Sequence, residues 1–358
     1  MELLEQLTQT PGVPGREHRI RQLILERLEG LVDDVSVDPM GSIIAIRHPR
    51  KAGKTVKPDP AADADPPTRV MVAAHMDQIG FLVRHVGDDG FLRVQNVGGF
   101  DVRNLFARLV SVETADGDLT GVLNPGGKPV HLASDEERKK IPEVTDLLID
   151  LGLPKDTVQQ RVKIGDMVTL KAPFSQIGDT VVAQCLDNRV ACWIALRSLE
   201  QLKQKNADHA AELHVVFTVQ EEVGLRGAMT SSYTVRPDVG IGLDTTLCVD
   251  TPGVPEDQRC TQQGQGVALT VMDSASIGDV GLLEDFERLA QQHDIPAQRS
   301  LLARGGTDTA SIQKAGGGTR AFTLSVPTRY IHTTCEMVHR TDLHAARDLL
   351  TAFLRDVK

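Results

Sequence analysis

The chain has 358 residues, of which 41% are hydrophobic and 25% are charged, and its formal net charge is −10. This composition is typical of a globular protein long enough for two domains. The excess of acid argues against a nucleic-acid or anionic-membrane partner, and no apolar run reaches the length of a transmembrane helix. The N-terminus, MELLEQLTQT, does not resemble a secretory signal, and the five cysteines form no CxxC pair. We therefore expect a cytoplasmic protein with reduced thiols.

The N-terminal part of the chain predicts two helices, a hairpin and one buried strand. Amphipathic helices are expected over residues 1–8 and 15–29, and a hairpin over 34–48. The proline-rich stretch 51–69 predicts a solvated loop, to which we assign no chemistry. The apolar, β-branched run RVMVAA at 69–74 is typical of a buried strand.

The pattern changes between residues 79 and 172, where short alternating strands are separated by turn signals such as GDDG, ADGD and PGGK. A small β-barrel or sandwich is expected there, with one helical stretch over 134–152. From about residue 174, strands and helices alternate again, as in RVACWIALRSLEQLKQ, LHVVFTVQ and TRAFTLSVPT. The sequence therefore predicts an α/β domain, residues 1–78 and 173–358, interrupted by an inserted all-β domain at 79–172.

Histidines and carboxylates stand at the ends of the predicted strands or at the start of a helix. The set comprises His75, Asp77, Asp187, Glu221, Glu222, Asp244 and His332. Reactive groups of open α/β sheets gather at the carboxyl ends of the strands, so one sheet edge could bring these side chains together. Two histidines and several carboxylates, without cysteine, suit a hydrolytic Zn²⁺, Co²⁺ or Mn²⁺ site.

These residue types also match the parts of a two-metal centre. Two ions about 3.5–4 Å apart need a bridging carboxylate, and Asp187 could supply it. Asp77 is well placed to orient His75. The adjacent Glu221 and Glu222 should diverge, which suits one metal ligand and one general base.

Each of these residues taken alone also has an ordinary structural explanation. Asp187 could cap the helix that follows it, and His332 could be a hydrogen-bonded core histidine. The Glu-Glu pair is common in proteins. The hypothesis of a metal site depends on the coincidence of all these groups at the ends of apolar runs.

Six motifs, in their order along the chain, resemble the M42 family of dinuclear metallo-aminopeptidases, which contains glutamyl aminopeptidases and the tetrahedral TET peptidases. The motifs are AHMDQIGF, LDNR, VQEEVGLRGA, GLDTT, GGTDTASIQ and PTRYIHTTCEMV. The resemblance implies a phosphorylase/hydrolase-like catalytic domain with a three-layer α/β/α sheet, and a PDZ-like β insert that helps the subunits to associate. Two departures are Gln78, where the family usually has Glu, and HTT in place of the family's HSP.

The resemblance also implies an activity and roles for individual residues. The enzyme would remove N-terminal residues from peptides with a free N-terminus by attack of a metal-activated hydroxide, with Glu221 as general base and Asp77 orienting a ligand. The implied metal ligands are His75, Asp187, Glu222, Asp244 and His332. Two divalent ions per subunit are expected, Zn²⁺ ahead of Co²⁺ or Mn²⁺, as is a homo-oligomer, a tetrahedral dodecamer built from dimers.

The segment GGTDTAS at 305–311 is expected to border the substrate pocket. Gly306 allows a close backbone approach, Thr307 lies beside it, and Asp308 could meet an amine or a side chain. A helix start capped by Thr307 is an equally good interpretation.

Two other functions are compatible with the sequence. An N-deacylase or a carboxypeptidase-like amidohydrolase would use the same metals. A non-catalytic scaffold would bind peptides to the β module by strand addition. A glucanase is disfavoured, because a glycosidase needs two free carboxylates and these are committed to metal.

Overall fold

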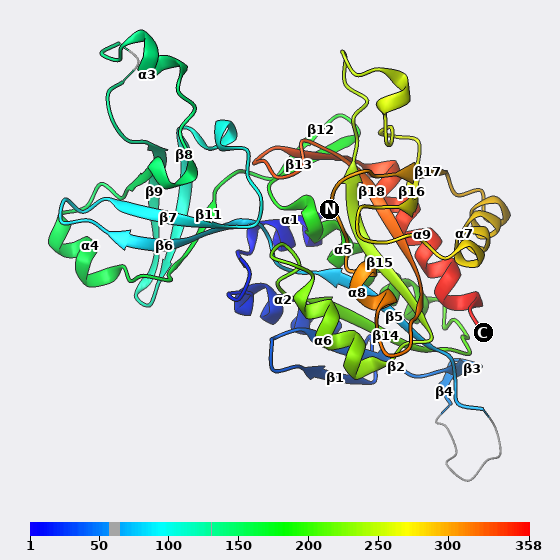
Figure 1. Ribbon diagram of the computed structural model, residues 1–358. Coiled ribbons are helices and arrows are strands. Elements are labelled where there is room, and N and C mark those ends of the chain that lie inside the picture. Colours follow the sequence, from blue (N-terminus) through cyan, green and yellow to red (C-terminus); the bar gives the residue numbers. More distant parts are fainter. Residues whose placement is uncertain (57–64, 130) are drawn as a thin grey trace.

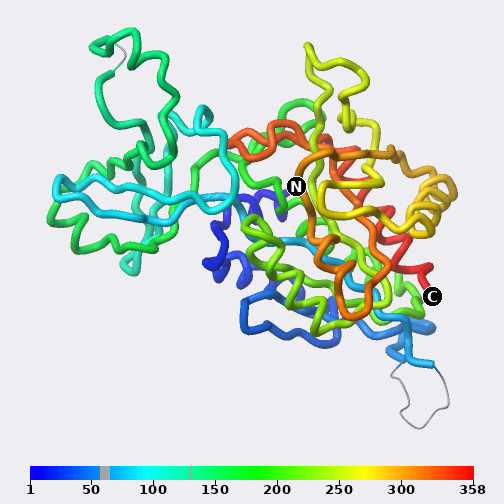
Figure 2. The backbone as a smooth tube through the Cα atoms, viewed as in Figure 1, coloured from blue at the N-terminus to red at the C-terminus, as the bar shows by residue number. Residues whose placement is uncertain are grey.

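A mixed β-sheet and a separate β-barrel organise the chain (Figure 1). The computed structural model describes residues 1–56, 65–129 and 131–358. Part of the loop expected at 51–69 therefore lies outside the described residues, and the strands β3 (Arg50–Lys51) and β4 (Lys54–Thr55) pair at its start. The chain enters the barrel after the sheet strand that ends at His75 and returns to the sheet with the strand that starts at Ser175 (Figure 2).

The large sheet places parallel strands at its centre. Its strands, in spatial order, are β1 (Asp34–Val37), β2 (Ile43–Arg47), β14 (Glu212–Thr218), β5 (Arg69–His75), β15 (Val239–Leu247), β18 (Arg320–Arg329), β19 (Glu336–His339), β13 (Thr180–Ala183) and β12 (Ser175–Ile177). The strands β16 (Val267–Met272) and β17 (Ala297–Leu301) extend the sheet from β18. Because β14, β5, β15 and β18 run parallel, their carboxyl ends meet at one edge.

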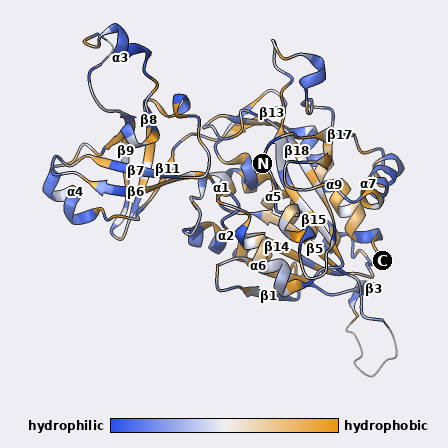
Figure 3. Cartoon of the chain, viewed as in Figure 1, coloured by the Kyte–Doolittle hydropathy of each residue, from blue (hydrophilic) through white to orange (hydrophobic). Residues whose placement is uncertain are grey.

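Helices cover both faces of this sheet, as the α/β/α expectation requires. Side chains alternate along β5, so Val70 and Val72 join the larger apolar core while Met71 and Ala73 join a smaller one on the opposite face. The larger core packs against α1 (Glu2–Gln9), α2 (His18–Leu28), α5 (Leu186–Gln204), α7 (Val280–Gln292) and α9 (Arg340–Asp356). The smaller core packs against α6 (Arg226–Val235) and α8 (Thr309–Gln313). The strands between these helices are largely coloured as hydrophobic in Figure 3.

The segment expected to be all-β forms a closed barrel. Its strands, in spatial order, are β10 (Leu147–Asp150), β7 (Leu92–Val97), β6 (Gly80–Val86), β11 (Met167–Leu170), β8 (Arg108–Thr114) and β9 (Gly117–Pro125). The barrel has its own apolar core, in which Phe81 stacks on Phe100 with 4.6 Å between the ring centroids. The remaining short elements are α3 (Asp135–Lys139), α4 (Lys155–Arg161), η1 (Val102–Leu105), η2 (Val144–Asp146) and η3 (Glu256–Gln258).

The prediction of one helical stretch over 134–152 is wrong in its second half. The helix α3 ends at Lys139, shortly before Pro142, which disfavours helical conformation in the residue before it. Residues Leu147 and Ile149 then point into the barrel core as part of β10, while Asp150 is exposed. The alternation of apolar and polar residues in LLID therefore produces a strand.

None of the helices in the described part of the chain is both long and apolar enough to cross a membrane.

Candidate active site

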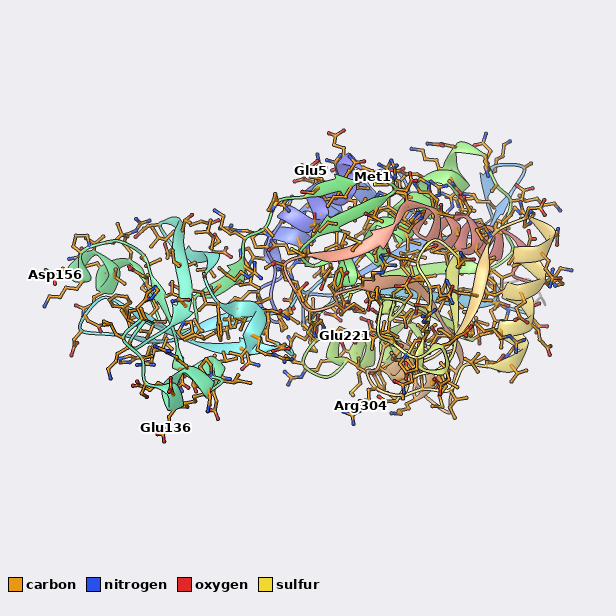
Figure 4. The ribbon with its side chains drawn as sticks, turned by 90° about the horizontal axis from the view of Figure 1, so that it is seen from above. Met1, Glu5, Glu136, Asp156, Glu221 and Arg304 are labelled. Atoms are coloured by element: carbon orange, nitrogen blue, oxygen red, sulfur yellow. The ribbon has the colours of Figure 1, made fainter. Side chains whose placement is uncertain are left out.

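The predicted site residues converge at the carboxyl edge of the sheet. His75 is the last residue of β5, Glu221 and Glu222 follow β14, and Asp244 lies in β15. Asp187 lies in the first turn of α5, where the backbone departs from helical geometry, and His332 lies between β18 and β19. Glu221 lies within the α/β part of the molecule, while Glu136 and Asp156 mark the distant barrel (Figure 4).

Asp187 lies between the two histidines. Its Oδ1 is 3.3 Å from His75 Nε2, and its Oδ2 is 3.5 Å from His332 Nε2. Asp244 Oδ1 is 3.8 Å from His75 Nε2, and Glu222 Oε2 is 3.4 Å from His332 Nε2. Both imidazoles thus face Asp187, and each also has at least one further carboxylate within 4.0 Å, which is compatible with Asp187 as a bridging ligand.

Asp77 contacts the Glu-Glu loop more closely than it contacts the histidine that it was expected to orient. Its carboxylate accepts hydrogen bonds from Glu221 N at 3.1 Å and from Glu222 N at 3.2 Å. The nearest oxygen of Asp77 to His75 Nδ1 is its main-chain carbonyl, at 3.3 Å, while the carboxylate is 3.6 Å away. Asp77 therefore holds the backbone of both glutamates and borders the imidazole as well.

The electrostatics of the site reflect an excess of buried negative charge. Burial raises the pKa of Glu222 to about 8 and that of Asp244 to about 6, and burial also raises the pKa of Glu221 well above its usual value. Burial lowers the pKa of His332, but Asp187 and Glu222 outweigh this effect and bring that pKa to about 9. Five carboxylates within 4.0 Å of two imidazoles are costly to bury without further cations.

The residues present fit a metal centre. Among the described residues, neither Asp187 Oδ1 nor Glu222 Oε1 has a hydrogen-bond partner, although both atoms are buried. Ligand atoms of His75, Glu221 and Asp244 lie within 4.8 Å of one another, as do those of His75, Asp187 and Glu222. Imidazole nitrogens together with carboxylate oxygens form a donor set that binds divalent ions well.

Two further carboxylates support the site and were missed from the sequence. Glu336 is buried, and it accepts hydrogen bonds from Asp187 N at 2.9 Å and from His332 N at 2.7 Å. Glu17 accepts a hydrogen bond from Gln220 N at 3.2 Å. The pKa of Glu17 is raised to about 7, mainly by burial and to a smaller extent by the negative charge of the nearby Asp77. Neither residue follows an apolar run of the central strands, so the reasoning from strand ends does not identify them.

A cavity of about 430 Å³ opens beside these groups. The residues that line it, other than the candidate ligands and Glu221, are Thr245, Thr246, Leu247, Leu302, Arg304, Gly305, Gly306, Thr307 and Ile331. Beside the candidate ligands and Glu221, the pocket thus has the cationic side chain of Arg304, three large aliphatic side chains and a wall of glycine and threonine.

Of the three residues expected to border the substrate, two line the pocket and one does not. Gly306 and Thr307 line the pocket, whereas Asp308 is only 2% exposed and accepts a hydrogen bond from the Thr218 hydroxyl. The Thr307 hydroxyl donates to Asp273 Oδ2 at 3.0 Å and so does not cap α8, which begins at Thr309. The wall of the pocket is therefore built by the glycines and Thr307, with Asp308 behind it.

An α/β sheet with a buried histidine and carboxylate centre at its carboxyl edge, open to a pocket, is the arrangement expected of a metal-dependent hydrolase. The model of the M42 glutamyl aminopeptidase family matches residues 60–349, and the chain belongs to this family. It is thus an aminopeptidase, a hydrolase that acts on peptide bonds.

Known proteins resemble the chain over nearly its whole length. The lysyl aminopeptidase of Pyrococcus furiosus is 30% identical, covering 100% of this chain and 97% of its own. The TET aminopeptidase of a marine sediment thaumarchaeote is 30% identical with a TM-score of 0.91, covering 100% of this chain and 96% of its own. The TET1 peptidase of Pyrococcus horikoshii is 29% identical with a TM-score of 0.86, covering 99% of each chain.

Proposed function

We propose that this aminopeptidase uses two divalent ions per subunit, Zn²⁺ ahead of Co²⁺ or Mn²⁺, to act on peptides with a free N-terminus. The observation that carries the proposal is Asp187, whose two oxygens face different histidines at 3.3 Å and 3.5 Å. One ion would be held by His75, Asp187 and Asp244, and the other by His332, Asp187 and Glu222.

We assign the general base to Glu221, although its position alone would also allow it to bind metal. Glu221 Oε2 and Asp244 Oδ1 are both 3.8 Å from His75 Nε2. Glu222 faces His332, and no other carboxylate except the bridge Asp187 lies within 4.0 Å of that imidazole among the described residues. Glu222 is therefore needed as a ligand on the His332 side, while Asp244 can serve the His75 side and leave Glu221 free.

The roles of the protein groups in hydrolysis follow from this assignment. When bound, the ions would supply Lewis acidity and lower the pKa of a water molecule. Glu221 accepts the proton of the attacking water at its carboxylate and returns a proton to the leaving amine. Asp77 keeps Glu221 oriented through the hydrogen bond from Glu221 N at 3.1 Å. The pocket beside the centre receives the N-terminal residue of the substrate.

We propose that residues 1–78 and 173–358 form the catalytic domain and that residues 79–172 form a PDZ-like insert. The separate apolar core of the barrel supports this division.

The Pyrococcus horikoshii TET1 peptidase can assemble into a tetrahedron or a large octahedral shell. We propose a homo-oligomer for this chain as well, a tetrahedral dodecamer built from dimers, and light scattering should give a mass near that of twelve subunits. A strict monomer in the presence of metal would contradict this assembly.

The cytoplasmic location stays a prediction, which cell fractionation would test.

Paired substrates test the proposed reaction. Aminoacyl p-nitroanilides with a free amine should be hydrolysed, their N-acetylated counterparts should not, and removal of metal with a chelator should abolish the activity. Preference for the acetylated compounds would indicate an N-deacylase. A protein that binds no metal and hydrolyses neither compound would indicate a peptide-binding scaffold.

A further inference from the structure

One buried carboxylate joins the two halves of the proposed metal centre. Glu336 is 1% exposed, and each of its oxygens accepts one main-chain hydrogen bond. The bond from Asp187 N to Oε2 is 2.9 Å long, and the bond from His332 N to Oε1 is 2.7 Å long. The side chain thus connects the residue that faces both histidines with one of those histidines.

The position of Glu336 in the sheet explains how it reaches both partners. It begins β19, which pairs with β13 through Ala183 and Glu336, and with β18 further along. The chain runs from β13 to Asp187 in four residues, and from β18 to His332 in three. Glu336 therefore stands on a hydrogen-bonded strand between the two segments that carry these groups.

The backbone of the His332 segment needs such an anchor. Tyr330 and His332 have φ angles of +61° and +63°, in the left-handed region that side chains with a Cβ atom adopt at a cost. A carboxylate can accept from two N–H groups at once. An amide of the same shape has one acceptor and one donor, so it would direct an N–H at one of the two main-chain N–H groups.

We propose that Glu336 is a positioning residue that fixes His332 relative to Asp187 and thereby sets the affinity of the metal site on the His332 side. The inference rests on the proposed two-metal function. It assigns to Glu336 a role beyond support of the fold, because the groups that it holds are metal ligands in that proposal. Loss of a residue that orients metal ligands commonly weakens metal affinity about 10–100-fold.

Glu336→Gln tests the role by titration of metal-free protein with Co²⁺, followed by visible absorption. The wild type should bind two equivalents. In the variant, the Co²⁺ affinity of the site on the His332 side should fall about 10–100-fold. The Co²⁺ affinity of the other site should stay close to that of the wild type. Excess metal should restore most of kcat, with little change in KM.

Asp342→Asn is the matched control. Asp342 is also fully buried and accepts main-chain hydrogen bonds on both oxygens, from Gly264 N at 2.8 Å and Gly266 N at 2.7 Å, but it contacts none of the candidate ligands. Its replacement should lower the thermal stability and leave both Co²⁺ affinities unchanged. If Glu336→Gln does not fold, Glu336→Asp keeps both acceptors on a shorter side chain and should show the same selective loss.

Three outcomes separate the claims. A wild type that binds fewer than two Co²⁺ ions would overturn the two-metal function on which the inference rests. If the wild type binds two ions and the Glu336 variant binds both with the same affinities as the wild type, only the role of Glu336 would be overturned. If Co²⁺ affinity falls equally in the Glu336 and Asp342 variants, the loss would be explained by general destabilisation of the protein, and the inference would also be overturned.

Discussion

Buried carboxylates hold the backbone of the loop that carries the proposed base. Three consecutive N–H groups, those of Gln220, Glu221 and Glu222, donate to Glu17 or Asp77 at 3.1–3.2 Å. Gln220 has a φ of +55°, so this loop leaves β14 through a conformation that is unfavourable without such partners. The backbone from which the two glutamate side chains project is therefore held by groups of the protein itself, which is the preorganisation that catalysis requires.

Replacement of each glutamate by glutamine should separate their roles. Glu221→Gln keeps the shape of the side chain but cannot accept a proton, so kcat should fall about 10²–10⁴-fold with little change in KM. Its metal content should stay near that of the wild type. Glu222→Gln should lose metal as well as rate, and added metal should restore part of the activity. The reverse pattern, measured by metal analysis and steady-state kinetics, would exchange the two assignments.

Close packing between β15 and α8 shapes one wall of the pocket. A Cβ atom added at Gly242 would lie 2.2 Å from Thr309 Oγ1, and one at Gly240 would lie 2.2 Å from Ile312 Cγ2. Both glycines precede Asp244 on the same strand, and Thr309 directly follows the GGTD segment, part of which lines the cavity. The small residues of VGIG thus allow α8 to lie against the strand and bring this segment to the site.

Gly242→Ala should therefore destabilise the protein. The added methyl group must push α8 away from β15, which should lower the free energy of unfolding by about 1–3 kcal/mol. Differential scanning calorimetry at fixed metal concentration would show this as a lower Tm. Gly317→Ala is the control, because a Cβ atom there meets no other atom within 4 Å. Equal Tm values for the two variants would refute this account of the packing.

The strands of the central sheet could be predicted because their apolar runs are long and stand next to clear turn signals. The helix α6 was missed, since its buried face consists mainly of the small residues Gly227, Ala228, Ser231 and Ser232. The strand β17 was missed because only two of the five residues in AQRSL are apolar, whereas β16 was missed although VALTVM is an apolar run. The grouping of His75, Asp187 and His332 could be predicted from strand ends. The contacts of Glu336 depend on the pairing of β19 with β13, which sequence patterns do not specify.

The whole molecule has a net charge of −10, and its buried centre is also rich in acidic residues. Protons and metal ions should compete for these buried carboxylates. Without metal, burial raises the pKa of Glu222 to about 8 and that of Asp244 to about 6, while the neighbouring acids raise the pKa of His332 to about 9 against the effect of burial. Metal ligands must be deprotonated, so these protons have to leave when ions bind.

Metal binding should therefore release protons, and the apparent metal affinity should fall as the pH is lowered from about 9 to about 6. The sign follows from the raised pKa values, because each group holds its proton below its pKa and must lose it to coordinate. Isothermal titration in buffers of different ionisation enthalpy would count the released protons. Uptake of protons on binding, or an affinity that does not change with pH, would contradict the proposed ligand set.

The metal stoichiometry of the wild-type chain tests the central claim most directly. Protein stripped with a chelator, reloaded with Zn²⁺ and dialysed should contain about two ions per chain by mass spectrometry, as a centre bridged by one carboxylate requires. Hydrolysis of a free-amine substrate by the same sample should return with the reloaded metal. A chain that retains no more than one ion while it is fully active would show that Asp187 does not bridge two metals and would contradict the account.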